Sequence, residues 1–298
     1  MSNAPTLGID IGGSGSRAIV HGTEGIRVID GPRVQIQPDG VANLAKDLIE
    51  TVGVQPRAIG LGATGMGTLV PDPQALADEL ASGGARVTVA IDAVTAHLGA
   101  LGGRPGAVIA LGTGAIALGW DGGSRWRRVD GWGHLLGDRG GGAWLGQRGF
   151  AAAIRAFDGI DESGRALLER ARQQFGEPQS WPSQIYFRSD RAGVLASFAT
   201  AVVRLAESGD QCAAALVTEA GIESARSAAS ALGPQQTAVA GTGGMFRPGE
   251  LLVDSFRGEL ARIRPDAELT DARGGSLEGA LRLAASDLPP HPGYIWRS

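Results

Sequence analysis

Cysteine is almost absent from this sequence, with Cys212 as the single example in 298 residues. One cysteine excludes a disulfide within the chain, and it excludes iron–sulfur and thiolate zinc sites, which need several thiolates. The four histidines show no metal-ligand spacing, so a zinc site is not expected either. Any chemistry must therefore come from carboxylates, hydroxyls and backbone groups.

Long apolar runs and a strong charge balance are also missing. No apolar run approaches the length of about 18 residues that a membrane helix needs, and no charged segment followed by an apolar one opens the sequence. We therefore expect a cytoplasmic protein without a membrane partner. The net charge of −4 gives no reason to expect nucleic acid as a partner.

Glycine, in contrast, is abundant, and three glycine turns each follow an apolar, strand-like run. The turns are Asp10-Ile11-Gly12-Gly13-Ser14-Gly15-Ser16, Gly112-Thr113-Gly114 and Gly241-Thr242-Gly243-Gly244. Glycines leave backbone N–H groups uncovered, and a nearby hydroxyl adds a further donor, so such turns suit phosphate. One turn is weak evidence, because glycine marks ordinary hairpins, but three of them predict a nucleotide site.

The order of the expected elements indicates a mixed α/β protein with two related halves. The first hundred residues read β-β-β-α-β-α-β-α, and helical spacing is clear over residues 41–52. Gly102–Gly106 is the best linker, after which strand, glycine turn and strand begin again. Residues 161–232 are expected to be mostly helical with a break at Ser180–Ser183, and the tail at 289–293 is expected to be irregular.

Several polar residues have both a structural and a functional interpretation. Asp10 is either a turn aspartate or an outer-sphere ligand of Mg²⁺, which prefers carboxylate oxygens. Asp92 and Asp138 each precede an expected helix, so an N-cap is the simple alternative to a functional role.

The loop around Trp132 is a further candidate, because a tryptophan between two glycines in a polar loop is poor core material. A flat ring that walls a sugar pocket is an equally good interpretation. The nearby Arg125, Arg127 and Arg128 are expected on a solvated face of a strand.

The set of motifs resembles the sugar kinase and actin-like ATPase superfamily. Residues 10–16 resemble its first phosphate motif, Leu111–Gly114 its second phosphate motif and Ala240–Gly244 its adenosine motif. Gly131-Trp132-Gly133-His134 followed by Gly137-Asp138 resembles the N-acetylglucosamine kinase branch, which includes bacterial glucosamine kinases. The resemblance runs from about residue 6 to 285 in the right order.

This resemblance implies two actin-like (ribonuclease H-like) α/β domains with mixed sheets, flanking helices and a cleft between them. The expected domains are residues 1–103 and 104–281, with a tail, 282–298, that returns to the first domain. ATP and Mg²⁺ are the implied cofactors, a homodimer is expected, and the γ-phosphoryl group would pass to the 6-hydroxyl of a hexose. Asp92 would act as the base and Asp10 as the metal ligand.

The resemblance also implies a set of binding residues. The nucleotide residues would be Gly12, Gly13, Ser14, Ser16, Gly112, Thr113, Gly114, Gly241, Thr242, Gly243 and Gly244. The sugar residues would be Thr64, Gly65, Asp92, Thr113, Asp130, Gly131, Trp132 and Asp138.

Two departures from the branch bear on the sugar. Asp130 stands where relatives that take N-acetylglucosamine usually have glycine or another small neutral residue, and Arg139 stands where an acidic residue is common. A carboxylate near the pocket suits a free ammonium at C2 better than an acetamide, so the sequence favours D-glucosamine as substrate. N-acetylglucosamine is the alternative.

Three other functions remain to be weighed. Activator ATPases of 2-hydroxyacyl-CoA dehydratases share the nucleotide core but need cysteines for a bridging iron–sulfur cluster. This chain has only Cys212, which argues against that function. A non-catalytic sugar or nucleotide sensor is a second alternative, against which the retained Asp92 argues. A kinase of plain glucose or another hexose is the third.

Overall fold

The computed structural model describes residues 4–12, 15–32, 39–66, 70–246 and 250–298. The chain forms two compact units. Unit 1 consists of Met1–Val108, Trp120–Trp126 and Asp271–Ser298, and unit 2 consists of Ile109–Gly119 and Arg127–Thr270. The domain boundaries expected from the sequence, after residues 103 and 281, stay a prediction.

Unit 1 contains a six-stranded mixed sheet with the order β11-β5-β4-β1-β2-β3. Its strands are β1 (Thr6–Gly12), β2 (Gly15–Gly22), β3 (Gly25–Gly31), β4 (Ala58–Ala63), β5 (Arg86–Ile91) and β11 (Ile295–Arg297). The neighbours β1, β4 and β5 run parallel, whereas β2, β3 and β11 are antiparallel to the strands they pair with. The carboxyl ends of three adjacent strands therefore meet at one edge of this sheet.

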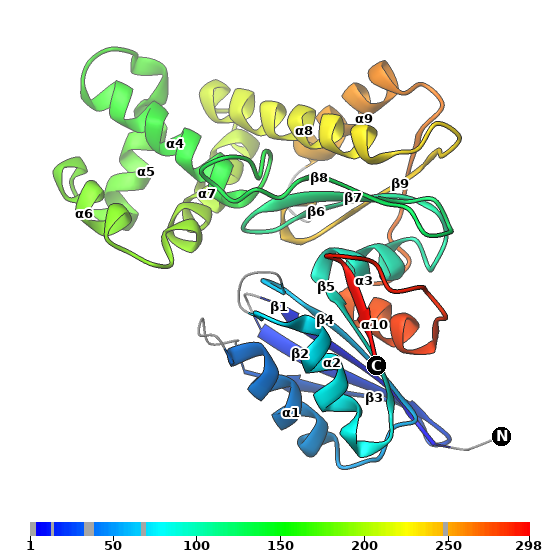
Figure 1. Ribbon diagram of the computed structural model, residues 1–298. Helices are drawn as coiled ribbons and strands as arrows, with labels where there is room; N and C mark the ends of the chain where they lie inside the picture. Colours follow the sequence, from blue (N-terminus) through cyan, green and yellow to red (C-terminus); the bar gives the residue numbers. More distant parts are fainter. Residues whose placement is uncertain (1–3, 13–14, 33–38, 67–69, 247–249) are drawn as a thin grey trace. The chain divides into compact units, whose positions relative to one another are not determined.

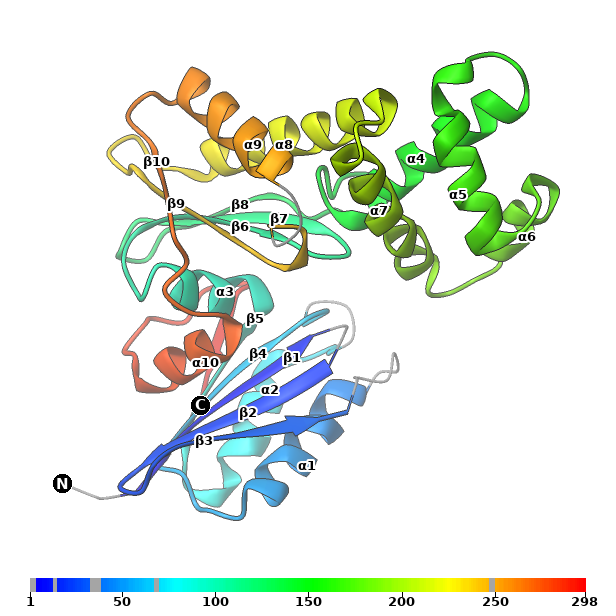
Figure 2. The ribbon, with the colours of Figure 1, turned by 180° about the vertical axis from the view of Figure 1, so that it is seen from behind.

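Helices cover both faces of this sheet (Figures 1 and 2). They are α1 (Gly40–Val52), α2 (Pro73–Leu80, followed by the 3-10 turn η1, Ala81–Gly83), α3 (Asp92–Ala100) and α10 (Ser276–Ala285). The helix expected over residues 41–52 forms, and its apolar stripe joins Leu7, Ile9 and Ile11 in one core. Because successive residues of a strand face opposite sides of the sheet, Gly8 and Asp10 lie on the other face. There the backbone of α10 packs directly against Gly8.

Unit 2 is built on a five-stranded sheet with the order β10-β9-β6-β7-β8. Its strands are β6 (Gly106–Leu111), β7 (Ala115–Trp120), β8 (Trp126–Asp130), β9 (Ala238–Thr242) and β10 (Glu268–Thr270). In Figure 1, α8 (Gln211–Ala231) and α9 (Glu250–Ile263) lie along one face of this sheet.

The other helices of unit 2 form a separate layer beside the sheet (Figure 1). They are α4 (Gly142–Phe157), α5 (Arg165–Phe175), α6 (Trp181–Tyr186) and α7 (Arg191–Glu207), with the 3-10 turns η2 (Glu162–Gly164) and η3 (Pro178–Ser180). Phe150, Phe175, Trp181 and Phe198 pack their rings together at centroid distances of 4.7–5.9 Å and form the core of this layer.

One local expectation needs correction, and one strand was not foreseen. Residues 180–183 do not simply break the helical run, because α6 begins at Trp181 with Pro182 in its first turn, where proline is tolerated. The irregular tail is followed by a strand that the sequence did not indicate, since β11 pairs with β5. Within the part of the chain that the structure describes, no helix has both the length and the apolar character needed to cross a membrane.

Candidate active site

Three polar residues meet at the carboxyl edge of the unit 1 sheet. Asp10 lies near the end of β1, Thr64 follows β4, and Asp92 follows β5. In the parallel register Ile11 is level with Ala63, and Ala63 with Ile91. The strand order thus brings together side chains that are far apart in the sequence, as expected at the open end of an α/β sheet.

Asp92 is the first residue of α3, and the structure gives it no N-cap role, because Ile91 is the cap residue. Burial raises the pKa of the Asp92 carboxyl, while a hydrogen bond from the Thr64 side chain and the backbone N–H of Ala93 act in the opposite direction. The charge of Asp10 raises the pKa further. A carboxylate with a raised pKa is a better proton acceptor than an ordinary one.

The position of α3 depends on contacts in which a backbone lies directly against a glycine. A Cβ at Gly62 would lie 2.3 Å from the Thr95 hydroxyl, and a Cβ at Gly99 would lie 1.9 Å from the Gly275 carbonyl oxygen. A Cβ at Gly279 of α10 would lie only 1.7 Å from the Thr95 carbonyl oxygen. These glycines let α3 press against β4 and α10, which fixes Asp92 on the same face as Asp10.

Asp10 is buried and pairs with Arg17 of the neighbouring strand, whose Nη2 is 3.0 Å from Oδ2. Burial raises the pKa of Asp10, and the Arg17 guanidinium partly offsets this effect. Among the described residues, no group of three or more His, Cys, Asp or Glu side chains is placed to hold a metal ion. Mg²⁺ at an ATP site commonly uses one or two carboxylates plus phosphates and water. The single carboxylate of Asp10 suits an ion that is bound together with phosphates, but it does not form a metal site made of protein ligands alone.

The first glycine turn is described only in part. Gly13 and Ser14, which were expected to bind nucleotide, lie outside the described residues. Gly12 pairs with Gly15 across the turn. The buried Ser16 hydroxyl donates to the Pro32 carbonyl oxygen at 2.7 Å, so it has no proton left for a phosphate. The structure therefore does not support the expected donor role of the Ser16 side chain.

The Gly-Thr-Gly turn of unit 2 joins β6 to β7, as expected. Its carbonyl groups accept hydrogen bonds from the first two residues of α4. The Gly142 N–H donates to the Gly112 oxygen and the Ala143 N–H to the Thr113 oxygen, both at 2.8 Å. The Gly112 N–H donates back to Gly114. In the described part of the chain no acceptor is found for the N–H groups of Thr113 and Gly114. Two free donors beside a hydroxyl are a suitable anion site.

The third glycine turn lies next to the second. It ends β9, and Gly243 has a φ of +99°, a backbone conformation that favours glycine. A Cβ there would lie 2.2 Å from the Leu111 carbonyl oxygen, at the end of β6. A Cβ at Gly241 would likewise lie 2.6 Å from the Phe246 ring. Gly244 is the first residue of the short 3-10 turn η4 (Gly244–Phe246). Unit 2 thus places the two motifs side by side, although the sequence separates them by more than a hundred residues.

Asp130 has a structural role that the sequence did not reveal. Its side chain is only 4% exposed, and its φ of +62° is rare for any residue other than glycine. Oδ1 accepts the N–H of Asp138 at 2.7 Å, and Oδ2 accepts the N–H of Arg139 at 2.9 Å. Both oxygens are therefore engaged within the protein, and the expected contact of Asp130 with the sugar stays a prediction.

Asp138 connects the sugar loop, residues 130–139, with the Gly-Thr-Gly turn. It does not cap α4, whose cap residue is Gly141. Oδ1 accepts the Gly133 N–H at 2.9 Å, and Oδ2 lies where a Cβ of Gly114 would come within 2.3 Å. Burial raises its pKa, and hydrogen bonds from Gly133 and Ala115 act in the opposite direction. One carboxylate thus touches both predicted binding elements of unit 2.

Trp132 is 65% exposed, as expected for a pocket wall and not for a core residue. The guanidinium of Arg128 lies 4.4 Å from the centre of its ring and donates to the carbonyl oxygens of Asp130 and Gly131. Arg125 and Arg127 are exposed, as expected, but Arg128 is partly buried in this contact. The sequence contained no signal for that contact beyond the closeness of the two residues.

A groove with a volume of about 660 Å³ lies elsewhere. It belongs to unit 1, where Leu98, Trp120, Arg282 and Asp287 are among its lining residues. None of the described residues expected to bind nucleotide or sugar lines it.

Two mixed sheets flanked by helices, with bare glycine turns at their strand ends, define the class of actin-like nucleotide-binding proteins. Residues 7–279 match the model of the BadF/BadG/BcrA/BcrD ATPase family, and the chain belongs to this family. The fold class and the resemblance expected from the sequence are thereby confirmed.

Individual relatives agree with this assignment. The chain is 29% identical over 211 residues to the N-acetylmuramic acid/N-acetylglucosamine kinase of Clostridium acetobutylicum, with 68% of each chain covered. A Chromobacterium violaceum structure, provisionally named an N-acetylglucosamine kinase, is 28% identical with a TM-score of 0.71 and covers 94% of this chain and 99% of its own. A ROK family glucokinase from Streptomyces griseus, solved with glucose and AMPPNP, is 21% identical with a TM-score of 0.58 over 94% and 99% of the two chains, a likeness of fold alone.

Proposed function

We propose that this protein is an ATP-dependent amino-sugar kinase that phosphorylates the 6-hydroxyl of a hexosamine. The observation that carries the proposal is Asp92, a carboxylate with a raised pKa that Thr64 holds at the strand edge beside Asp10. Similarity to the kinases of the preceding paragraph supports the substrate class.

The roles of the residues follow from their surroundings. Asp92 accepts the proton of the 6-hydroxyl while that oxygen forms a bond to the γ-phosphorus, and the bond from the γ-phosphorus to its bridging oxygen breaks to release ADP. The free N–H groups of Thr113 and Gly114 are suitable donors to phosphate oxygens. Asp10 fits a Mg²⁺ ion that neutralises phosphate charge when it is bound.

The identity of the sugar depends on the loop around Asp130. Asp130 is buried and both of its oxygens already accept backbone N–H groups, so its carboxylate is poorly placed to meet the ammonium of glucosamine. Arg139 and Arg128 add positive charge to the same loop, which disfavours a second cation. We therefore propose an N-acetylated amino sugar as the preferred substrate and keep glucosamine, the expectation from the sequence, as the alternative.

A coupled assay of ADP release tests this proposal. It uses ATP and Mg²⁺ with N-acetylglucosamine, N-acetylmuramic acid, glucosamine and glucose, for the wild type and Asp92→Asn. We expect the highest kcat/KM with an N-acetylated sugar and a loss of about a hundredfold or more in Asp92→Asn, because general-base catalysis contributes at least that much.

Other results have definite meanings. A preference for glucosamine would overturn the choice of sugar but not the kinase. Nucleotide binding without turnover of any sugar would instead indicate a sensor. The expected homodimer stays a prediction, which analytical ultracentrifugation would test.

A further inference from the structure

The sugar loop is closed by one buried side chain, that of Asp130. Its two oxygens bind the consecutive N–H groups of Asp138 and Arg139 at 2.7 and 2.9 Å. Gly137 is required beside it, because a Cβ there would lie 2.1 Å from Oδ1. The hydrogen bonds of the Asp130 carboxylate thus join the two ends of residues 130–139, and we call this closed loop the ring.

The ring determines where the Asp138 carboxylate lies. Asp138 has a φ of +56°, in the left-handed region that is uncommon for residues other than glycine. The N–H bond to Asp130 holds its main chain, and the Gly133 N–H holds its Oδ1 at 2.9 Å. Asp138 is a carboxylate that the family resemblance assigns to the sugar, so its placement bears directly on how well the sugar binds.

We propose that Asp130 is a positioning residue for sugar binding, which acts through the main chain of Asp138 and Arg139 and not through contact with the substrate. The inference rests on the proposed function, since it takes an amino sugar as the ligand. A buried carboxylate is costly unless its oxygens are satisfied, and here the two N–H groups satisfy them.

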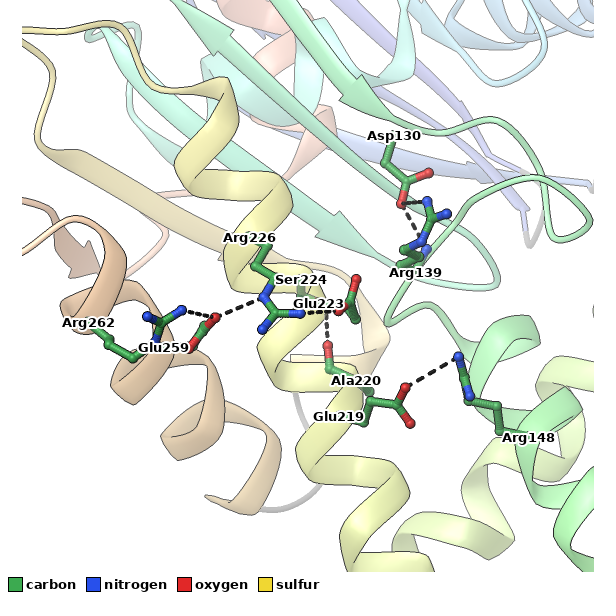
Figure 3. A network of polar contacts seen from close by, with 10 residues as sticks. All are labelled: Asp130, Arg139, Arg148, Glu219, Ala220, Glu223, Ser224, Arg226, Glu259 and Arg262. Carbon is green, nitrogen blue, oxygen red and sulfur yellow. Dashed lines mark hydrogen bonds and ion pairs between the residues drawn. The ribbon is translucent and has the colours of Figure 1, made fainter.

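The backbone bonds contribute more than the ion pair with Arg139. The Arg139 Nη1 atom is 4.0 Å from Oδ2, and its side chain is half exposed, so solvent screens the attraction. Figure 3 shows Asp130 and Arg139 facing each other, apart from the network of Arg226, Glu259 and Arg262 on α8 and α9. Glu259 is likewise a buried carboxylate with arginine partners, and it serves as a matched control.

The test compares Asp130→Asn, Arg139→Met and Glu259→Gln. Asparagine keeps the size of the side chain and tolerates the left-handed conformation, but its NH₂ group faces one N–H donor. The measurements are the sugar KM, kcat, the KM for ATP and the melting temperature. We expect Asp130→Asn to raise the sugar KM about tenfold or more, the effect of losing a hydrogen bond to a charged group.

The two other variants separate positioning from general stability. We expect Arg139→Met to change the sugar KM less than about threefold. Glu259→Gln is expected to lower the melting temperature while leaving the sugar KM unchanged. An unchanged sugar KM in Asp130→Asn overturns the inference. So does a rise of the same size in Glu259→Gln, or an Arg139→Met variant as impaired as Asp130→Asn.

Hydrogen exchange of the wild type covers the case in which Asp130→Asn does not fold. The N–H groups of Asp138 and Arg139 are expected to exchange much more slowly than that of the exposed Leu135 in the same loop. Equal rates would show that the ring is not closed. If the wild type phosphorylates none of the sugars, the proposed function fails, and the exchange rates still decide whether Asp130 holds the loop.

Discussion

At the scale of single residues, the contact between Thr64 and Asp92 has a measurable consequence. The hydrogen bond from the Thr64 side chain favours the ionised form of Asp92 and so lowers its pKa, against the larger effect of burial. A general base must be ionised to act. The pKa of Asp92 therefore sets the pH below which the proposed kinase loses activity.

We predict that Thr64→Val moves the acidic limb of the pH profile of kcat to higher pH, because the ionised carboxylate loses a donor while its burial remains. Thr64→Ser keeps the hydroxyl and is expected to keep the wild-type profile. The measurement is the initial rate with ATP and sugar over the range in which the wild type loses activity. A profile that is the same in all three proteins would rule out this contact as a determinant of the pKa.

The residue scale is also where the sequence was least informative. The candidate set of Asp10, Asp92 and Asp138 was found from strand ends and motif resemblance. The orientation of Asp130 could not be found in this way, because it depends on a left-handed backbone and on N–H groups eight and nine residues further on. Likewise, the pairing of Thr64 with Asp92 comes from the register of β4 and β5, which no local pattern specifies.

At the scale of elements, α3 and α10 pack with their backbones almost in contact, and Gly279 is the closest point. We predict that Gly279→Ala destabilises the protein by about 3 kcal/mol, because the added methyl group meets the backbone of Thr95 and cannot be relieved by a rotamer change. Urea unfolding measures the effect.

Gly258→Ala is the matched control for that substitution. Gly258 lies in α9, is exposed, and has no atom within 4 Å of an added Cβ. Alanine there should stabilise the helix by about 1 kcal/mol. Equal effects at both positions would mean that the contact between α3 and α10 is loose.

Most elements were predictable because their periodicity is strong. The helices over α1 and α8 carry regular apolar stripes, and glycine or aspartate directly follows strands β5 to β10. β11 was missed because three residues after a proline-rich tail carry no pattern. It forms only because β5 offers an edge, which is information held by the rest of the chain.

At the scale of the whole molecule, a buried histidine links stability to pH. His97 is fully buried in α3, its Nε2 lies 3.0 Å from the Gly106 carbonyl oxygen, and its ring meets the edges of Trp120 and Trp126. No partner for its Nδ1 is found among the described residues. Burial lowers the pKa of His97 from 6.5 to about 4.

This pKa predicts a loss of stability in mild acid. Between pH 6.5 and 4 the unfolded chain binds a proton that the folded protein does not, so the stability is complete above 6.5 and falls towards 4. The full loss is about 3 kcal/mol. Urea unfolding at pH 7.5 and 5 should show a larger fall for the wild type than for His97→Gln.

An equal fall in both proteins would contradict the role of His97. The raised pKa values of Asp10, Asp92 and Asp138 act in the opposite direction, since their ionisation in the folded state is unfavourable as the pH rises. These groups are common to both proteins and cancel in the comparison.

The division of the chain has a consequence for the order in which the protein is made. Unit 1 needs Asp271–Ser298, because α10 packs on β1 and β4, and β11 completes its sheet. A ribosome delivers β1 first and α10 only after all of unit 2 has been synthesised. The first unit to begin folding is therefore the last to finish, and the part of its sheet around Gly8 and Gly60 stays uncovered until the final helix arrives.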